Sequence, residues 1–322
     1  MTILVTGAAG FIGMHVAEAL LARGEKVIGL DSLTPYYDLC LKNARRDRLL
    51  AQPYFSFQQV NIADRAAVAA MFKKYPDVTR IIHLAAQPGV RHSLIDPYSY
   101  IEANVMGHLV MLEAARALPR LEHFLYASSS SVYGGNKELP YREVDRVDHP
   151  VSLYAATKRA DELISEAYGH IFGLPQTGLR FFTVYGPWGR PDMAPWLFAD
   201  AILSGRPITL YEGGRLRRDF TFVEDIVAGV LGALDHPPVG GTPRLLNIGN
   251  HRSVEVRRFV AVLEESLGRK ATIRDAPRPA TDVAETFADV SAIQALCGFE
   301  PKTPIEIGVP RFAAWFRDWV AA

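Results

Sequence analysis

The fold is decided by the stretch Ile3-Leu4-Val5-Thr6-Gly7-Ala8-Ala9-Gly10-Phe11-Ile12-Gly13. Its first three apolar residues predict a buried strand, and residues 11–23 predict a helix that Gly24 closes. Between them the glycines recur with GxxGxxG spacing, which suits a tight turn, close approach of the backbone to a ligand, and close packing of helix on strand. Because the first N–H groups of a helix are free and lie at its positive end, this turn predicts a pyrophosphate site.

The next strand ends in an acidic residue that narrows the choice of ligand. Residues 26–30 predict this strand, and Asp31 follows it directly. A carboxylate at this point accepts hydrogen bonds from both hydroxyls of an adenosine ribose and repels a 2′-phosphate, which favours NAD over NADP. Asn61 and Ile62, after the third strand, are predicted to flank the adenine. A plain strand–turn–helix without a ligand is the alternative.

Short apolar strands and amphipathic helices alternate as far as residue 182, and prolines and glycines interrupt the pattern beyond it. Such alternation predicts a parallel sheet covered on both faces, because crossovers between parallel strands are right-handed. We expect an α/β fold in which residues 1–182 form a Rossmann-type doubly wound parallel sheet that binds NAD. Residues 183–322 are expected to form a smaller, mixed α/β substrate-binding region that returns some segments to the sheet. Strands are expected at 54–60, 80–84, 123–127 and 176–179, and helices at 66–73, 101–117, 154–172, 223–234, 254–267 and 305–320.

The composition argues against several classes of protein. The 322 residues include 35 basic and 35 acidic side chains, and this zero net charge disfavours nucleic-acid binding and a polybasic membrane patch. Residues 1–21 are apolar but lack a basic start and contain glycines, and no stretch approaches ~18 uninterrupted apolar residues. We therefore expect neither a signal peptide nor a membrane span. Cys40 and Cys297 form no CxxC pair, so we expect no metal site and a reducing, cytoplasmic location.

Two Tyr-x-x-x-Lys matches are present, and their surroundings separate them. Tyr133 and Lys137 are joined by two glycines and an asparagine, which predicts a loop. Tyr154 and Lys158 begin a predicted helix, on which residues four apart share a face. The ammonium then lies near the phenol and stabilises the phenolate, so that Tyr154 is a candidate general base for a sugar or alcohol hydroxyl. The alternative is a core aromatic beside a surface lysine.

Four consecutive serines, residues 128–131, follow an apolar strand. The carboxyl ends of parallel strands are where such sheets bind ligands, and serine hydroxyls can share protons with a substrate hydroxyl. The alternative for any one of these serines is a polar turn.

Further motifs follow one another in a recognisable order. Together with the glycine turn and the Tyr154–Lys158 pair, they resemble the extended short-chain dehydrogenase/reductases that act on nucleotide sugars, over essentially the whole chain. These motifs are His83-Leu84-Ala85-Ala86, Asn104, Arg180-Phe181-Phe182, Tyr185-Gly186-Pro187 and Arg218-Asp219-Phe220. Within this family the chain is most similar to the UDP-glucuronate 4-epimerases, through Tyr36-Tyr37-Asp38-x-x-Leu41-Lys42 and Trp188-Gly189-Arg190-Pro191-Asp192-Met193-Ala194.

The resemblance implies a role for each matching residue. Ser129, Tyr154 and Lys158 become the catalytic trio. Ser130 and Ser131 are implied to contact the substrate. Thr183 and Arg190 are implied to bind the sugar carboxylate, and Arg218 and Arg278 the UDP diphosphate. The implied NAD contacts are Gly7, Gly10, Phe11, Ile12, Gly13, Asp31, Asn61, Ile62, Leu84, Ala85, Ala86, Asn104, Tyr154 and Lys158.

Two positions depart from the family pattern. Asn61 stands where aspartate is usual, although its amide oxygen can still accept from adenine. Pro279-Ala280-Thr281-Asp282-Val283 is one residue longer than the usual Pro-Gly-Asp-Val, which leaves the role of Arg278 open.

The resemblance also implies a reaction. Related enzymes oxidise C4 of the sugar with bound NAD and then diverge. Dehydratases and decarboxylases use an acidic residue near the end of the serine run, where this chain has Ser130 and Ser131. The implied outcome is 4-epimerisation of UDP-glucuronate to UDP-galacturonate through a 4-keto intermediate, with NAD retained. A UDP-glucose/galactose 4-epimerase, a UDP-glucuronate decarboxylase and a non-enzymatic NAD-binding sensor are the alternatives.

Arg190 is expected to prevent a side reaction. Oxidation at C4 of a uronic acid gives a β-keto acid, which loses carbon dioxide readily. The planar fork of an arginine matches a carboxylate and can hold it out of alignment with the carbonyl. The alternative is that Arg190 only pairs with Asp192 in a surface turn. The resemblance further implies a homodimer formed through helices 101–117 and 154–172.

Overall fold

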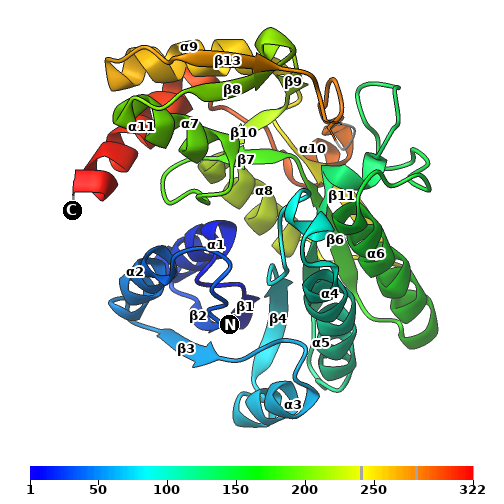
Figure 1. Cartoon of the computed structure of the whole chain (residues 1–322). Coiled ribbons are helices and arrows are strands. Elements are labelled where there is room, and N and C mark those ends of the chain that lie inside the picture. Colours follow the sequence, from blue (N-terminus) through cyan, green and yellow to red (C-terminus); the bar gives the residue numbers. More distant parts are fainter. Residues whose placement is uncertain (240–241, 280–281, 322) are drawn as a thin grey trace.

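The computed structural model describes residues 1–239, 242–279 and 282–321 (Figure 1). Its centre is a seven-stranded parallel sheet in the order β11-β6-β5-β4-β1-β2-β3. The order reverses between β1 and β4, which is the switch point where doubly wound sheets bind ligands. The predicted fold class is confirmed. The strands are β1 (Thr2–Thr6), β2 (Lys26–Asp31), β3 (Phe55–Gln59), β4 (Val78–His83), β5 (His123–Ser129), β6 (Gln176–Phe181) and β11 (Arg244–Ile248).

Helices cover both faces of the sheet, because successive side chains of a strand point to opposite faces. Ile3 and Val5 of β1 belong to one apolar cluster, and Leu4 between them belongs to another. The first cluster is completed by α1 (Phe11–Ala22), α2 (Leu39–Leu50), α8 (Val223–Leu234) and α10 (Ser291–Cys297). The second is completed by α3 (Arg65–Lys74), α5 (Gly107–Arg116) and α6 (Leu153–Phe172).

Much of the chain beyond residue 183 forms a smaller region around a third apolar cluster, at the top of Figure 1. Its helices are α7 (Ala194–Ser204), α9 (Val256–Leu267) and α11 (Ile305–Ala321). Its strands pair in twos: β7 (Thr183–Tyr185) with β10 (Phe220–Phe222), β8 (Ile208–Tyr211) with β13 (Ile273–Ala276), and β9 (Arg217–Arg218) with β12 (Val254–Glu255). Two later elements belong to the central sheet instead: α8 packs beside α1, and β11 pairs with β6.

Two predicted helices differ from the observed ones. Residues 101–117 start as a π-helix over Ile101–Met106 and become α-helical only at Gly107. Within this wide turn Asn104 forms three hydrogen bonds, to Gln87 N, Gln87 O and Thr157 Oγ1. Such π-helical segments are frequent at functional sites, and the hydrophobic periodicity of a sequence does not indicate them. Residues 254–255 are strand β12 rather than helix.

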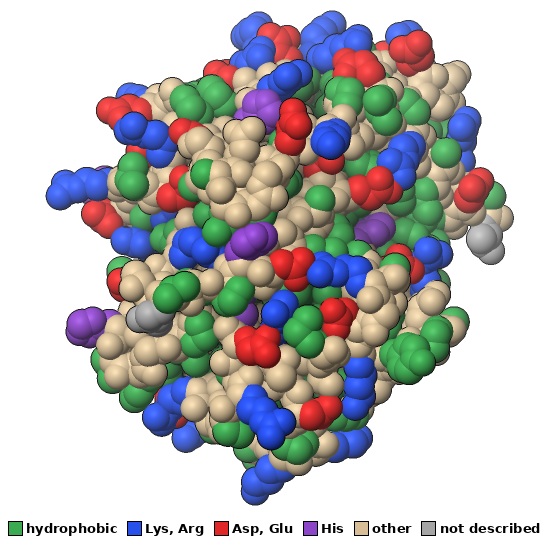
Figure 2. Space-filling model, turned by 180° about the vertical axis from the view of Figure 1, so that it is seen from behind, with side chains coloured by type: hydrophobic (Ala, Val, Ile, Leu, Met, Phe, Trp, Pro, Cys, Tyr) green, Lys and Arg blue, Asp and Glu red, His purple; other side chains and the backbone are tan. Residues whose placement is uncertain are grey.

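Four short helical turns connect the larger elements: η1 (His92–Leu94), α4 (Pro97–Tyr100), η3 (Ser130–Tyr133) and η4 (Glu212–Gly214). Within the described ranges, no helix has both the length and the apolar character to cross a bilayer. On the face that Figure 2 shows, basic and acidic side chains are interspersed rather than gathered by sign.

The turn from β1 to α1 depends on backbone contacts that side chains would prevent. Gly7 has a φ of +71°, in the left-handed region, and Gly10 N donates to Gly7 O at 2.8 Å. A Cβ at Gly13 would overlap Gly7 O, and one at Gly7 would lie 2.9 Å from Ala85 N. The glycines therefore bring the start of α1, the end of β1 and the loop after β4 together.

Candidate active site

A cavity of about 1170 Å³ extends along the carboxyl ends of the strands toward the smaller region. Its position matches the ligand-binding crevice of open parallel sheets. All but two of the predicted site residues line it, the exceptions being Asn104 and Arg278. The predicted residues that line it are Gly7, Gly10, Phe11, Ile12, Gly13, Asp31, Asn61, Ile62, Leu84, Ala85, Ala86, Ser129, Ser130, Ser131, Tyr154, Lys158, Thr183, Arg190 and Arg218.

The β1–α1 turn is suited to a dinucleotide pyrophosphate. Gly10 stands at the N-cap of α1 and offers no side chain to cap it, and the first turn contains no acidic residue. The free N–H groups and the positive end of the helix therefore face an anion without competition. Cβ atoms at Gly7 and Gly13 would clash with the backbone of residues 84–85 and of Gly7, so the glycines permit the tight turn that presents these N–H groups, and the turn fits the diphosphate of NAD.

Asp31 lies at the end of β2, where its carboxylate is held by backbone groups. Its Oδ2 accepts from Ala9 N at 3.1 Å and its Oδ1 from Leu33 N at 2.8 Å. Lys42 on α2 donates to Thr34 O at 2.9 Å and to Thr34 Oγ1 at 3.0 Å, and burial lowers the pKa of Lys42. The residues present fit the adenosine ribose of NAD.

Asn61 and Asn104 differ in how they relate to the cavity. Asn61 lines it, and its Oδ1 accepts from Ala63 N at 3.0 Å. Asn104 is 1% exposed and lies behind the wall, where its three hydrogen bonds join the loop after β4 to α6. Its place in the structure supports the cavity wall instead of facing the ligand.

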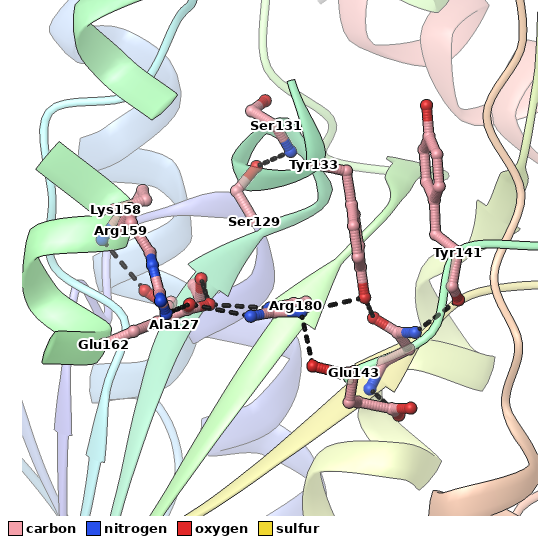
Figure 3. A network of polar contacts seen from close by, with 12 residues as sticks. Ala127, Ser129, Ser131, Tyr133, Tyr141, Glu143, Lys158, Arg159, Glu162 and Arg180 are labelled. Atoms are coloured by element: carbon pink, nitrogen blue, oxygen red, sulfur yellow. Dashed lines mark hydrogen bonds and ion pairs between the residues drawn. The ribbon is translucent and has the colours of Figure 1, made fainter. Parts of the chain in front are cut away.

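The proposed catalytic trio comes together at the end of β5 and the start of α6. Ser129 ends β5, Tyr154 is the second residue of α6, and Lys158 follows one turn later. Lys158 Nζ donates to Ala127 O at 2.9 Å and to Asp161 Oδ2 at 3.0 Å, as Figure 3 shows in part. An ammonium has three donors, so one remains available to the cavity.

Asp161 was not singled out from the sequence. Its side chain is 1% exposed, and burial raises the pKa of Asp161 to about 6. The spacing from Lys158 (i, i+3 on a helix) is a signal that could have indicated this ion pair. The pair places the Asp161 carboxyl group directly beside the Lys158 ammonium.

A buried polar network fixes α6 against the sheet (Figure 3). Glu162 forms a two-point ion pair with Arg180 of β6, at 2.8 and 2.9 Å. Ser128 Oγ of β5 donates to Glu162 Oε1 at 2.6 Å. Arg180 Nη1 donates to Tyr133 OH at 3.1 Å, and Tyr133 OH donates to Asn247 of β11 at 2.7 Å. Charge-assisted hydrogen bonds, which are stronger than neutral ones, join α6 to β5 and β6, and the neutral bond of Tyr133 extends the network to β11.

The network also accounts for the first Tyr-x-x-x-Lys match. Tyr133 is 2% exposed, stacks on Tyr141 at 4.4 Å between ring centroids, and uses its hydroxyl within the network. Lys137 is exposed. These two residues belong to the core and the surface respectively, and neither lines the cavity.

In the loop after β7, Arg190 and Asp192 form a two-point ion pair at 3.0 and 2.8 Å. Tyr36 OH donates to the same carboxylate at 3.0 Å. All three residues line the cavity, as does Thr183 at the start of β7, so the pair lies in the cavity wall rather than in a surface turn. Arg190 Nη1 takes no part in the pair and leaves a donor group for a ligand.

The two arginines predicted for the diphosphate lie in different surroundings. Arg218 lines the cavity, donates to Arg217 O at 2.8 Å, and has its pKa lowered by burial. Arg278 is 36% exposed at its side chain, lies 3.6 Å from the Glu212 carboxylate, and does not line the cavity. Ala280 and Thr281, where the chain departs from the family pattern, lie outside the described residues.

Arg91 is a cavity residue that the sequence analysis missed. It lies 3.3 Å from the Asp282 carboxylate and 5.1 Å from the centroid of the Tyr211 ring. Its place in the loop after β4 was a usable signal, because loops at the carboxyl ends of strands surround the crevice. In the part of the chain that the structure describes, no His, Cys, Asp and Glu side chains gather in threes as a metal would need.

Comparison with known proteins agrees with this geometry. Residues 3–249 match the NAD dependent epimerase/dehydratase family. A probable UDP-glucuronate 4-epimerase of Rhizobium meliloti is 43% identical, over 98% of this chain and 97% of the relative. UDP-glucuronate 4-epimerase 3 of Arabidopsis thaliana is 45% identical, over 99% of this chain and 77% of the relative.

Among solved structures, the UDP-glucuronic acid 4-epimerase of Bacillus cereus in complex with UDP-glucuronic acid and NAD aligns with a TM-score of 0.92. The two proteins are 31% identical, and the alignment covers 99% of this chain and 100% of that one. The fold and site define a nucleotide-binding α/β enzyme of the short-chain dehydrogenase/reductase type. The chain belongs to the NAD dependent epimerase/dehydratase family.

We expect the loss of Arg180 and the loss of Arg159, the two arginines that pair with Glu162, to lower the free energy of unfolding by different amounts. Arg180→Met leaves Glu162 charged and buried without its main partner, so we expect it to lower the free energy of unfolding by about 3–5 kcal/mol. Arg159→Met removes a half-exposed partner of the same carboxylate, at 3.0 Å, and should cost about 1 kcal/mol or less. Urea unfolding of both variants measures this, and equal losses would contradict the central place of Arg180.

Proposed function

We propose that this chain is a UDP-glucuronate 4-epimerase that interconverts UDP-glucuronate and UDP-galacturonate and keeps its NAD bound throughout. One observation supports this above others: Tyr154, Lys158, Ser129 and Arg190 line the same cavity as the glycine turn. The names of the relatives support the same activity.

Bound NAD supplies a hydride acceptor that can return the hydride to the same carbon. The chain would hold it through the β1–α1 turn, Asp31 and Lys158. Tyr154 accepts the proton of the 4-hydroxyl as C4 is oxidised and gives it back when the carbon is reduced. Lys158 stabilises the phenolate in between, and Ser129 Oγ hydrogen-bonds to the reacting oxygen.

Inversion at C4 requires the 4-keto sugar to present its other face before reduction. Residues 130 and 131 are serines, so neither supplies the carboxylic acid that the related dehydratases and decarboxylases use. Arg190 and Thr183 hold the sugar carboxylate, and they keep its bond to C5 out of alignment with the ketone. The reaction therefore ends in epimerisation, and the sugar keeps all its carbon atoms.

The UDP part belongs to the smaller region in this proposal. Arg218 binds the diphosphate, and residues 183–322 provide the substrate-binding part while residues 1–182 provide the NAD-binding part. We leave Arg278 out of the binding set because its guanidinium faces Glu212 and lies outside the cavity.

Assembly and location complete the proposal. Exposed apolar side chains lie on α4, the adjoining π-helix and α6, which support a homodimer formed through these elements: Tyr98 (83% exposed), Ile101, Met106 and Leu163. Cys40 and Cys297 are both unpaired, which fits a reducing cytoplasm.

The function is tested by a time course of proton NMR spectra on purified protein with UDP-glucuronate and no added cofactor. We expect UDP-galacturonate to accumulate to an equilibrium. Tyr154→Phe should slow this by about 10²–10⁴-fold, because it removes the general base, while bound NAD stays at the wild-type level. Tyr54→Phe is the matched control, because Tyr54 is 71% exposed and does not line the cavity.

The NMR experiment also separates the alternatives. Turnover of UDP-glucose at a higher kcat/KM than UDP-glucuronate would identify the other epimerase, and UDP-xylose as the main product would identify a decarboxylase. Normal turnover by Tyr154→Phe would overturn the catalytic assignment, and no turnover of any sugar by wild-type protein would favour a sensor.

Arg190→Ala tests the protection of the β-keto acid. We expect a lower kcat/KM for UDP-glucuronate and release of carbon dioxide during turnover, because the carboxylate loses the guanidinium that holds it. Arg190→Lys keeps the charge but not the planar fork, so its carbon dioxide release should be intermediate. Headspace detection of labelled carbon dioxide from carboxyl-labelled substrate measures both, and wild-type behaviour of Arg190→Ala would refute the role.

A further inference from the structure

The loop that contains Arg190 is bound by residues of the sheet region, in addition to the Arg190–Asp192 pair within the loop. His15 Nε2 of α1 lies 3.0 Å from Pro187 O. Arg45 Nη2 of α2 donates to the carbonyls of residues 188 and 189, at 2.5 and 3.0 Å. Tyr36, just before α2, donates to Asp192. Each of these contacts joins residues more than 140 positions apart in the chain.

Arg45 is the centre of these contacts and is itself fully buried, with 0% exposure. Its Nη1 donates to Tyr37 OH at 2.6 Å and to Ala9 O at 3.3 Å. Its hydrogen bonds within the described residues all go to uncharged oxygens, and burial lowers the pKa of Arg45. A buried cation without a carboxylate partner is costly, so its presence calls for a role beyond packing.

The loop it binds has an unfavourable backbone conformation. Trp188 has a φ of +62°, a region in which bulky residues are strained by about 1–3 kcal/mol. The Trp188 ring packs on Trp315 and Trp319 of α11, at 5.5 and 5.6 Å between centroids. Arg45 binds the carbonyl oxygens of Trp188 and Gly189, which belong to successive peptide units, and so stabilises this turn. Arg190, which lines the cavity, follows directly.

Arg45 also reaches the glycine turn. Ala9, whose carbonyl accepts from Arg45, donates its own N–H to Asp31 at 3.1 Å. One guanidinium thus joins the segment that would hold NAD to the segment that would hold the sugar carboxylate. Arg45 itself does not line the cavity.

We propose that Arg45 is a positioning residue that sets the loop of Trp188 and Gly189 so that Arg190 recognises the carboxylate of a UDP-uronic acid. This inference rests on the proposed function. It assigns selectivity between a uronate and a neutral hexose in part to a residue of α2, outside the substrate-binding wall.

Binding measurements test the proposal on full-length protein with NAD bound, in a Tyr154→Phe background so that the sugars stay intact. Titration calorimetry gives the Kd of UDP-glucuronate, UDP-glucose and UDP. We expect Arg45→Met to reduce the preference for UDP-glucuronate over UDP-glucose by about tenfold, the loss typical of a misplaced charge-assisted hydrogen bond, and to leave UDP binding unchanged.

Arg46→Met is the matched control. Arg46 lies on the same helix and pairs with Asp47 beside it, at 2.8 Å, so the substitution removes the same charge without touching the loop. Arg45→Lys keeps the charge but cannot reach four oxygens, and we expect an intermediate preference. It also serves as the second variant if Arg45→Met does not fold.

The outcomes separate the two claims. Retention of the full preference by a folded Arg45 variant would overturn the positioning role and leave the proposed function standing. Equal loss of affinity for all three ligands would also overturn it, because it would indicate general disruption. Absence of any preference in the background protein itself would overturn the proposed function, and the positioning role with it.

Discussion

The buried ion pair between Glu162 and Arg180 is the interaction on which the active site depends. Tyr154, Lys158 and Glu162 are spaced by four residues, so they share one face of α6. Because Arg180 fixes Glu162 at two points, it also sets the rotation of the helix about its axis. The Lys158 ammonium then lies against the end of β5, where it donates to Ala127 O and where Ser129 is found (Figure 3), and Tyr154, one turn earlier, lines the same cavity.

A second constraint acts on the other wall of the cavity. In the proposed reaction, the oxidation and reduction of C4 use the glycine turn, the tyrosine–lysine pair and a serine, which the sheet and its helices supply. The proposed partner of the uronate carboxylate, Arg190, comes from a loop beyond β7. Hydrogen bonds from His15, Arg45 and Tyr36 bind this loop to the sheet region. They fix the position of the loop relative to the cavity wall that the sheet and its helices form.

The sequence predicted those features that depend on local pattern. The β–α alternation, the glycine turn, Asp31 at the end of β2 and the helix of Tyr154 and Lys158 are all found where expected. In each case the signal lies within one element or across one turn. The resemblance to a known family extended this to Arg190 and Arg218, which no local pattern would have singled out.

What could not be predicted depends on pairs that are distant in sequence. Arg45 and Trp188 are 143 positions apart, and nothing in the pattern of α2 indicates that one of its arginines is fully buried. Asn104 matches the family motif, yet its hydrogen bonds turn it to Gln87 and Thr157 through a π-helical segment. Arg278 also matches by position, and its exposure and its approach to Glu212 could be known only from the structure.

The central claim is that one hydrogen leaves C4 of the sugar and returns to the same carbon from a cofactor that stays in place. UDP-glucuronate labelled with deuterium at C4 tests it most directly, with turnover followed by NMR in ordinary water. We expect the UDP-galacturonate formed to retain its deuterium at C4 and no label to enter the solvent. Loss of deuterium to water, or formation of product only in proportion to added NAD, would contradict it.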